Sequence, residues 1–411
     1  MEQHFLLPTD NARRLYQQHA KELPIIDFHN HLNVADLAAD RRYPDITALW
    51  LATDPYKHRL MRICGVPEQY ITGDAEPFEK FKKYCEIFPL LAGNPVFDWS
   101  RMELSNIFGI PELPDADTAR YIYDQAGEML ASPEFSHNGI LKRFHIVYQS
   151  PVATWQEELS GFDGVTVAPS LRGDDLLIQQ PTWEILAQRL DAFEAKKCRF
   201  ADHALDADFF ETDTDGSKSR YLVDLGVEYA KRGWTLLLHM DAKRQTSSRL
   251  RQLAGPAGGY AAVGGSFPIS KICDLLGQME AAGGLPDTVL FPLNMSDQAP
   301  LAVLQGSFSQ DGVASKVQLG PAWWWCDHAL GIENTLECIA NFGVVSQFIG
   351  MTTDSRSVLS FLRHDYFRRL LCRWLDQKNQ TWALPQATLG QIAENICYYN
   401  ANNQLRRNKN G

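Results

Sequence analysis

Eight short runs of apolar and β-branched residues recur along the chain, and most of them are followed by a segment with helical periodicity. Repeated strand–helix units favour a parallel sheet, and eight of them favour closure into an α/β fold of the (β/α)8 TIM-barrel type. The fourth run has weak strand propensity on its own. The predicted strands are Pro24–Phe28, Phe144–Tyr148, Gly164–Ala168, Cys198–Ala201, Trp234–Leu238, Thr288–Leu293, Lys316–Leu319 and Gln347–Met351.

The first connection is far longer than the others, because it runs from His31 to Arg143. It contains helix-like segments broken by prolines, which predicts a mainly helical insertion. These segments are Asp45–Trp50, Glu79–Phe88, Trp99–Phe108 and Thr118–Leu130, and Pro55 is among the breaks. A segment between strand 1 and helix 1 of a barrel lies over the face that carries active sites, so we expect it to cover a substrate.

The predicted organisation therefore has three parts. Residues 1–33 form an N-terminal helix and the first strand, residues 34–142 form the helical insertion, and residues 143–411 form the rest of the barrel and the C-terminal helices.

Composition limits the kinds of partner. The chain has 411 residues with 39 Lys+Arg against 50 Asp+Glu, a net charge of −11, which argues against a general nucleic-acid or anionic-membrane surface. No stretch approaches the roughly 20 apolar residues of a membrane helix, and the N-terminus lacks a signal-peptide hydrophobic region. The eight cysteines are scattered, as is typical of reduced thiols. We expect a cytoplasmic protein with a small-molecule substrate.

A metal site is predicted at the strand ends. His29 and His31 lie two apart, so on a strand they face the same side, and zinc favours imidazole ligands. Asp354, after the eighth strand, completes a three-ligand set with an open position. The alternatives are two hydrogen-bonded loop histidines and a helix-capping Asp354. Strand 4 ends without the lysine of a carbamate-bridged pair, so one divalent ion, with zinc as the expected metal, is favoured.

Other polar residues follow predicted strands at the same face. His239 is a fourth ligand, a nearby acid, or a histidine bonded to backbone. Asp202 and His203 offer an acid and an imidazole or have a structural role. Arg172 and Arg356 could bind an anion bidentately, or form surface ion pairs.

Two further patterns are open to a simple structural interpretation. The aromatic run Trp323–Trp325 indicates packing, or a face against which a sugar ring lies. The charged run Arg363–Arg369 predicts a solvated, ion-paired helix face. Motifs of dinucleotide, phosphate-cradling and serine-hydrolase sites are absent from the sequence.

The segment FIGMTTDSRSVLSFLRHDYFRRLLCR at Phe348–Arg373 strongly resembles the C-terminal signature of the uronate isomerase (glucuronate isomerase) family of the amidohydrolase superfamily. The resemblance continues in order through nearly the whole chain. Its further segments are Ile25–Leu32, Leu49–Val66, Asn94–Ile110, Pro169–Arg172, Cys198–His203, Leu238–Arg244 and Lys316–Asp327. It departs from the family pattern at Pro55, His58, Tyr148–Ser150 and Lys243–Thr246.

The resemblance implies a barrel with a helical insertion after strand 1 and a set of site residues. It implies His29, His31 and Asp354 as metal ligands, and it adds Tyr56, an insertion tyrosine that reaches the site. The expected catalytic residues are Asp354, Tyr56, Asp202 and His239, and the expected substrate contacts are Arg172, Arg356, Tyr56 and Trp325. Tyr56 would need help from Arg356 or the metal to move a proton, because a free phenol has a pKa near 10.

The resemblance also implies an activity. Family members interconvert D-glucuronate with D-fructuronate and D-galacturonate with D-tagaturonate, most simply by proton transfer between C2 and C1 through a cis-enediol. A homo-oligomer is expected. Two alternatives are a mononuclear metal-dependent hydrolase or decarboxylase of a small sugar acid, and a sugar-acid binding protein without turnover.

Overall fold

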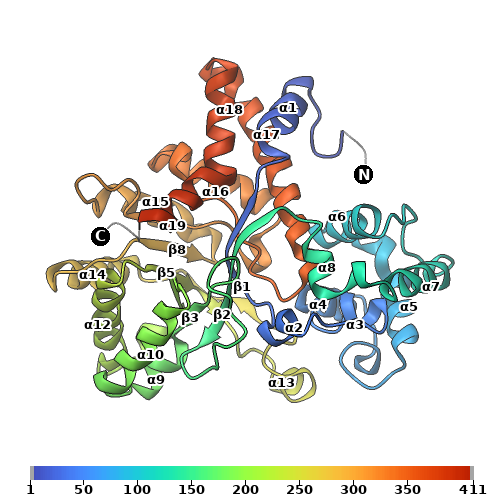
Figure 1. Ribbon diagram of the computed structural model, residues 1–411, viewed down its shortest axis with the longest axis horizontal. Helices are drawn as coiled ribbons and strands as arrows, with labels where there is room; N and C mark the ends of the chain where they lie inside the picture. Colours follow the sequence, from blue (N-terminus) through green and yellow to red (C-terminus); the bar gives the residue numbers. More distant parts are fainter. Residues whose placement is uncertain (1–3, 408–411) are drawn as a thin grey trace.

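The computed structural model describes residues 4–407; the outermost residues of the predicted first and last parts, 1–3 and 408–411, lie outside the described range. Seven strands form one parallel sheet in the order β1-β2-β3-β4-β5-β8-β9 (Figure 1). The strands β1, β5 and β8 are buried along their whole length, as expected where both faces of a sheet are covered. The bounds are β1 Ile25–Asn30, β2 Ile146–Thr154, β3 Ser170–Arg172, β4 Phe200–Leu205, β5 Thr235–Met240, β8 Thr288–Pro292 and β9 Val317–Leu319.

The predicted eighth strand, Gln347–Met351, is not a regular strand, but the chain there still closes the barrel. On one side, the Ile349 amide donates to Oε1 of Gln318 in β9, at 3.1 Å. On the other side, the Asp354 amide donates to the carbonyl of His29, at 3.2 Å, and the His31 amide donates to the carbonyl of Ser355, at 2.9 Å. The segment therefore takes the place of an eighth strand between β9 and β1, and the fold is of the TIM-barrel type.

Asp27 in β1 is the centre of this closure. Its carboxylate accepts from the Thr352 hydroxyl at 2.9 Å and from the Thr353 amide and hydroxyl at 2.6 and 2.8 Å. Burial alone would raise the pKa of Asp27, but hydrogen bonds from His364, Asn30 and Thr353 hold it below its ordinary value. Side-chain bonds from an ionised group thus replace part of the missing backbone ladder.

The predicted third strand, Gly164–Ala168, is wrong. There the chain makes only an isolated bridge between Val167 and Gln149, and β3 begins two residues after the predicted end. The reason is local, because the Asp163 side chain accepts from the amides of Val165 and Val167, at 2.7 and 2.8 Å, and folds the β-branched run into a turn. A two-stranded antiparallel pair, β6 Ala242–Lys243 and β7 Ala262–Val263, was not predicted.

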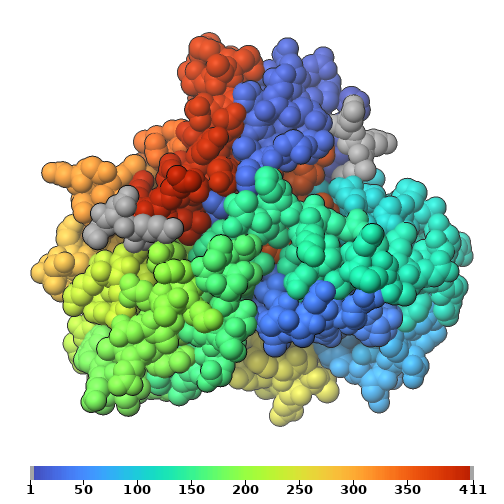
Figure 2. Space-filling model, in the orientation of Figure 1, coloured from blue at the N-terminus to red at the C-terminus, as the bar shows by residue number. Residues whose placement is uncertain are grey.

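The segment between β1 and β2 is mainly helical. In Figure 1 the helices α3, α5 and α7 lie together on one side of the strands, and in Figure 2 these blue to blue-green residues occupy one side of the visible face. The helices are α2 Val34–Ala38, α3 Ile46–Trp50, α4 Pro55–Ile63, α5 Pro77–Ile87, α6 Pro95–Met102, α7 Ala119–Leu130 and α8 His137–Leu141.

Helix α4 shows why a proline was misread as a break. Pro55 stands at the first helical position, where its missing amide donor costs nothing. Asp54 caps the helix by accepting from the amides of Tyr56 and Lys57, at 2.9 and 3.2 Å. The cap places Tyr56 in the first turn.

The remaining helices surround the barrel and lie at the ends of the chain. They are α1 Asp10–Leu15, α9 Asp174–Gln179, α10 Trp183–Ala195, α11 Phe209–Thr212, α12 Ser217–Lys231, α13 Ser248–Ala254, α14 Ile269–Ala281, α15 Gln298–Ser307, α16 Ala329–Phe342, α17 Arg363–Trp382, α18 Gln386–Glu394 and α19 Asn400–Arg407. Within residues 4–407, no helix combines the length and the apolar character that crossing a bilayer requires.

The charged run at the start of α17 is buried, so the prediction of a solvated face is wrong. Arg363, Arg368 and Arg369 are only 5%, 5% and 8% exposed. The Arg368 guanidinium donates to the carbonyls of Lys21, Leu23 and Pro24, which lead into β1. Figure 1 shows α1 beside α17, so this helix joins the N-terminal segment to the barrel.

Candidate active site

A cavity of about 540 Å³ opens at the carboxyl ends of the strands. The barrel contributes His29, Arg172 and His239 to its wall, and the insertion contributes Thr53 to Tyr56. Both parts of the chain therefore line one space, at the face where TIM barrels carry their active sites.

The two histidines after β1 converge on one carboxylate. Oδ1 of Asp354 lies 3.1 Å from Nε2 of His29 and 3.1 Å from Nε2 of His31. Asp354 does not cap the following turn, because Ser357 has that position and accepts from the Leu359 amide. The ligand atoms of the three residues lie within 4.8 Å of one another.

The Asp354 carboxylate and the His29 imidazole each favour the charged form of the other. Burial alone would raise the pKa of Asp354, but hydrogen bonds from His29 and His31 hold it well below its usual range. Burial likewise opposes charge on His29, yet the carboxylates of Asp202 and Asp354 raise its pKa. Burial lowers the pKa of His31 to about 4. Two imidazoles and a carboxylate that face a cavity are a donor set that fits a divalent cation such as zinc.

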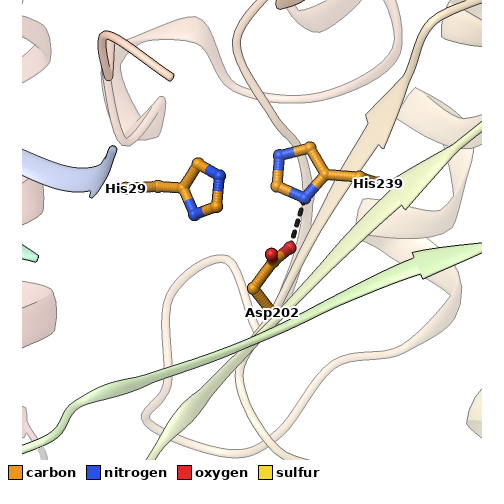
Figure 3. Close-up of side chains that lie close together, drawn as sticks. All are labelled: His29, Asp202 and His239. Carbon is orange, nitrogen blue, oxygen red and sulfur yellow. Dashed lines mark hydrogen bonds and ion pairs between the residues drawn. The ribbon is translucent and has the colours of Figure 1, made fainter. Parts of the chain in front are cut away.

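His239 and Asp202 form a second pair from neighbouring strands, and Figure 3 shows His29 opposite them. Nδ1 of His239 lies 2.6 Å from Oδ1 of Asp202, and its ring centroid lies 4.6 Å from that of His29. Burial lowers the pKa of His239, so the ring is neutral, donates from Nδ1 to Asp202, and leaves its buried Nε2 without a partner in the described chain. His29, Asp202 and His239 are also close enough to share an ion.

The contacts of Arg172 indicate that Asp202 is not itself a metal ligand. Nη1 of Arg172 donates to Oδ2 of Asp202 at 3.0 Å, while Nε and Nη2 of Arg172 contact Asp174 at 2.9 and 2.7 Å. Both oxygens of Asp202 are therefore engaged, one by His239 and one by Arg172. Asp202 holds His239 in one orientation.

Arg356 differs from Arg172 in having no hydrogen-bond or ion-pair partner among residues 4–407, although it lines the cavity. Burial lowers the pKa of Arg356, the Asp354 carboxylate acts to raise it, and the nearby charges of Arg172 and Arg244 act to lower it further. Arg244 also lines the cavity and lies with its guanidinium 5.5 Å from the ring centre of Trp324. A guanidinium without a hydrogen-bonded partner that faces a cavity has its donors free for a carboxylate or phosphate.

Tyr56 reaches the cavity from α4, as the resemblance implies. Its hydroxyl lies 2.8 Å from the Trp324 carbonyl and 2.9 Å from Oδ2 of Asp327. Burial and the Asp327 carboxylate raise the pKa of Tyr56 well above 10. Sequence reasoning connected neither Tyr56 to Asp327 nor Asp327 to its ion-pair partner Arg363, at 3.1 Å, because no local pattern links residues so far apart.

Besides the fully buried Asp202, two further predicted residues lie outside the cavity wall. Trp323 and Trp324 line the cavity, whereas the Trp325 indole donates to the Ala261 carbonyl at 3.2 Å and packs on Tyr56 with ring centres 5.0 Å apart. His203 points away from Asp202, and its Nε2 lies 3.0 Å from the Tyr229 hydroxyl. This contact with a buried tyrosine favours the structural role of His203 over a role at the cavity.

A TIM-type barrel with a possible metal-binding group and an unpaired arginine in one cavity at its strand ends defines a barrel enzyme. Within that class, the chain belongs to the glucuronate isomerase family, whose sequence model matches residues 1–220 and 211–405. A uronate isomerase of Caldanaerobacter subterraneus is 35% identical and aligns over 98% of both chains. One of Haemophilus influenzae is 34% identical and aligns over 99% of both.

Solved structures share the fold. The uronate isomerase of Thermotoga maritima aligns with a TM-score of 0.90 at 24% identity, over 98% of this chain and 99% of its own. The glucuronate isomerase of Caulobacter crescentus aligns with a TM-score of 0.88 at 21% identity, over 99% of this chain and 97% of its own. The barrel with its insertion is therefore a known architecture.

Proposed function

We propose that the protein is a hexuronate isomerase that interconverts D-glucuronate with D-fructuronate and D-galacturonate with D-tagaturonate. One observation carries the proposal: the group His29, His31 and Asp354 shares a cavity with the unpaired guanidinium of Arg356. A sugar acid needs both, because its carbonyl end requires an electrophile and its carboxylate end requires a cation. Relatives named uronate isomerase, similar over nearly the whole chain, support it.

Arg356 is the proposed main anchor of the substrate carboxylate. Arg172 is the second, although Asp174 and Asp202 occupy three of its five N–H groups. Trp325 is proposed to act on the substrate through Tyr56, on which it packs.

His29, His31 and Asp354 would hold one divalent ion, and zinc suits two imidazoles and one carboxylate. When bound, such an ion polarises carbonyl and hydroxyl oxygens of a substrate as a Lewis acid. The orientation of the histidines comes from the chain itself, since the His29 amide also donates to the Thr352 hydroxyl, at 2.9 Å.

Two protons move in the isomerisation, one on carbon and one on oxygen. We assign the carbon proton to the Asp354 carboxylate, which takes it from C2 and returns it to C1. Tyr56 serves the oxygens, because O2 must lose a proton to become the ketone and O1 must gain one. His239, held by Asp202, presents its Nε2 lone pair to a substrate hydroxyl.

The deciding experiment incubates the zinc-loaded protein with each aldohexuronate and assays the 2-ketouronate formed. Ketouronate from either substrate is expected, with deuterium at the product C1 when the reaction runs in D2O. If the loaded protein forms no ketouronate from either substrate, the proposed function is wrong.

The proposal includes the organisation of the molecule. Residues 34–142 act as the cover of the active site, which agrees with the place of Thr53 to Tyr56 in the cavity wall. We also propose a cytoplasmic homo-oligomer. Light scattering of the purified chain measures its mass, and a monomer at micromolar concentration would refute the oligomer.

A further inference from the structure

A buried chain of three polar groups leads away from the cavity behind Tyr56. The Tyr56 hydroxyl lies 2.9 Å from Oδ2 of Asp327, and Nη1 of Arg363 donates to the same oxygen at 3.1 Å. The Arg363 guanidinium also stacks on Trp99, 3.9 Å from its ring centre. Tyr56 lines the cavity, whereas Asp327 and Arg363 lie behind it.

The direction of the Tyr56 proton follows from these contacts. The two oxygens within hydrogen-bond distance, Oδ2 of Asp327 and the carbonyl oxygen of Trp324, are both acceptors. Tyr56 therefore donates its single proton away from the cavity and leaves its oxygen lone pairs for a substrate hydroxyl. Burial and Asp327 raise the pKa of Tyr56 well above 10, so the phenolate itself is not an available base near neutral pH.

We propose that Asp327 is the terminal proton acceptor of the isomerase reaction and that it acts through Tyr56. The O–H bond at the substrate O2 breaks as its proton moves to the Tyr56 oxygen, while the proton of Tyr56 moves to Oδ2 of Asp327. The same two transfers in reverse deliver a proton to O1, so Tyr56 and Asp327 end unchanged. Tyr56 stays neutral between transfers, which avoids the buried phenolate. This inference rests on the proposed function.

The surroundings of Asp327 suit a group that gains and loses a proton. Burial raises the pKa of Asp327 to about 7, while Arg363 and the Tyr56 hydroxyl act to lower it and the Asp354 carboxylate acts to raise it. A proton acceptor with a pKa near the working pH is the most effective kind. Oδ1 of Asp327 is buried and without a partner among the described residues.

Helix α17, which carries Arg363, also carries part of a second group of tyrosine, aspartate and arginine that serves as a matched control. The Tyr16 hydroxyl donates to Asp365, Nε of Arg369 donates to Asp365 at 2.9 Å, and Arg369 also contacts the Tyr16 hydroxyl at 3.1 Å. This second group of tyrosine, aspartate and arginine joins the π-helical turn Tyr16–Ala20, which follows α1, to α17 and is absent from the cavity wall. This second group has the same three side-chain types as Tyr56, Asp327 and Arg363 but no proposed part in the reaction.

The test compares Asp327→Asn with Asp365→Asn. An asparagine oxygen still accepts the Tyr56 hydrogen bond but cannot take its proton. We expect Asp327→Asn to lower kcat roughly 100-fold with little change in KM, and to remove the acid limb near pH 7 from the wild-type kcat profile. Asp365→Asn should leave kcat unchanged. Asp327→Glu should restore part of kcat, which guards against simple loss of folding.

A double-variant cycle makes the proposal refutable. Adding Asp327→Asn to Tyr56→Phe should cause no further loss, because both changes break one relay. Asp327→Asn within twofold of wild-type kcat, or losses that multiply in the double variant, would overturn the proposal.

A readout without substrate separates this inference from the proposed function. With 3-fluorotyrosine at position 56, fluorine NMR follows the titration of that phenol, and its pKa should fall in Asp327→Asn but not in Asp365→Asn. A wild-type chain inactive on both uronates would refute the proposed function, whereas an unchanged phenol pKa in Asp327→Asn would refute the contact on which the relay depends.

Discussion

The two arginines of the cavity are expected to differ in function because their partners differ. Arg356→Lys should raise KM about 10- to 100-fold, since an ammonium cannot bind a carboxylate through two parallel hydrogen bonds. Arg172→Lys should mainly lower kcat, because Arg172 engages the Asp202 oxygen that does not hold His239. Steady-state kinetics on both uronates decides, and equal effects of the two variants on KM would contradict this division.

Asp354 is proposed both as a metal ligand and as the group that moves the carbon proton. Asp354→Asn keeps the size of the side chain but removes its charge, so turnover should fall by roughly 1,000-fold or more while circular dichroism stays unchanged. Retention of full activity would refute both assignments.

The metal is tested separately from Asp354. Removal of the ion by a chelator should abolish isomerase activity, and added zinc should restore it, because His29 and His31 present nitrogen ligands. The far-ultraviolet spectrum should not change, since the bonds of Asp27 to Thr352 and Thr353, which follow the irregular segment Gln347–Met351, hold β1 without the ion. Full activity after exhaustive chelation would show that the ion is not required.

At the scale of elements, Asp27 is expected to determine whether the barrel closes. Asp27→Asn should destabilise the protein by about 2 to 4 kcal/mol, because several buried donors lose an ionised acceptor. Asp163→Asn, at an exposed turn, is the control, and its cost should stay within about 1 kcal/mol. Urea unfolding measures both. Similar costs in the two variants would contradict the role of Asp27.

Sequence reasoning located most strands because hydrophobic burial alone marks them. It failed where side chains bond to backbone: Asp163 turned one apolar run away from the sheet, and Asp27 holds an irregular segment in the place of a strand. The close grouping of His29, His31 and Asp354 could be predicted from strand ends alone. The contacts of Asp327 with Tyr56 and Arg363 could not, because they bring together α4, the segment after β9 and α17, which lie far apart in the sequence.

At the scale of the whole molecule, buried ionisable groups make the free energy of unfolding decrease as the pH falls. Burial lowers the pKa of His137 and His203 to about 4, below the unfolded value near 6.5, so folding favours their neutral forms. Their contribution is complete above pH 6.5 and is lost as the pH falls toward 4. The lowered pKa values of Asp27 and Asp54 add a contribution that is present above about 3.9 and lost below it.

We therefore expect the melting temperature to fall gradually from pH 6.5 to 4 and steeply below. Differential scanning fluorimetry across this range measures it, and His137→Gln should flatten the upper part of the curve. A melting temperature independent of pH down to 4 would contradict the burial of these histidines as neutral rings.

The buried charges of α17 also bear on how this protein can evolve. Most of the twenty residues of the helix are buried, and its arginines bond to the segment before β1, to the Phe5 carbonyl near the N-terminus and to Asp327. An exchange of arginine for lysine is usually tolerated on exposed surfaces, but at these buried positions of α17 we expect selection to remove it. Helix α7 buries Ala119, Ile122, Ala126 and Leu130 and packs Tyr123 and Met129 against the core, so its exposed positions are the ones expected to vary among descendants of this gene.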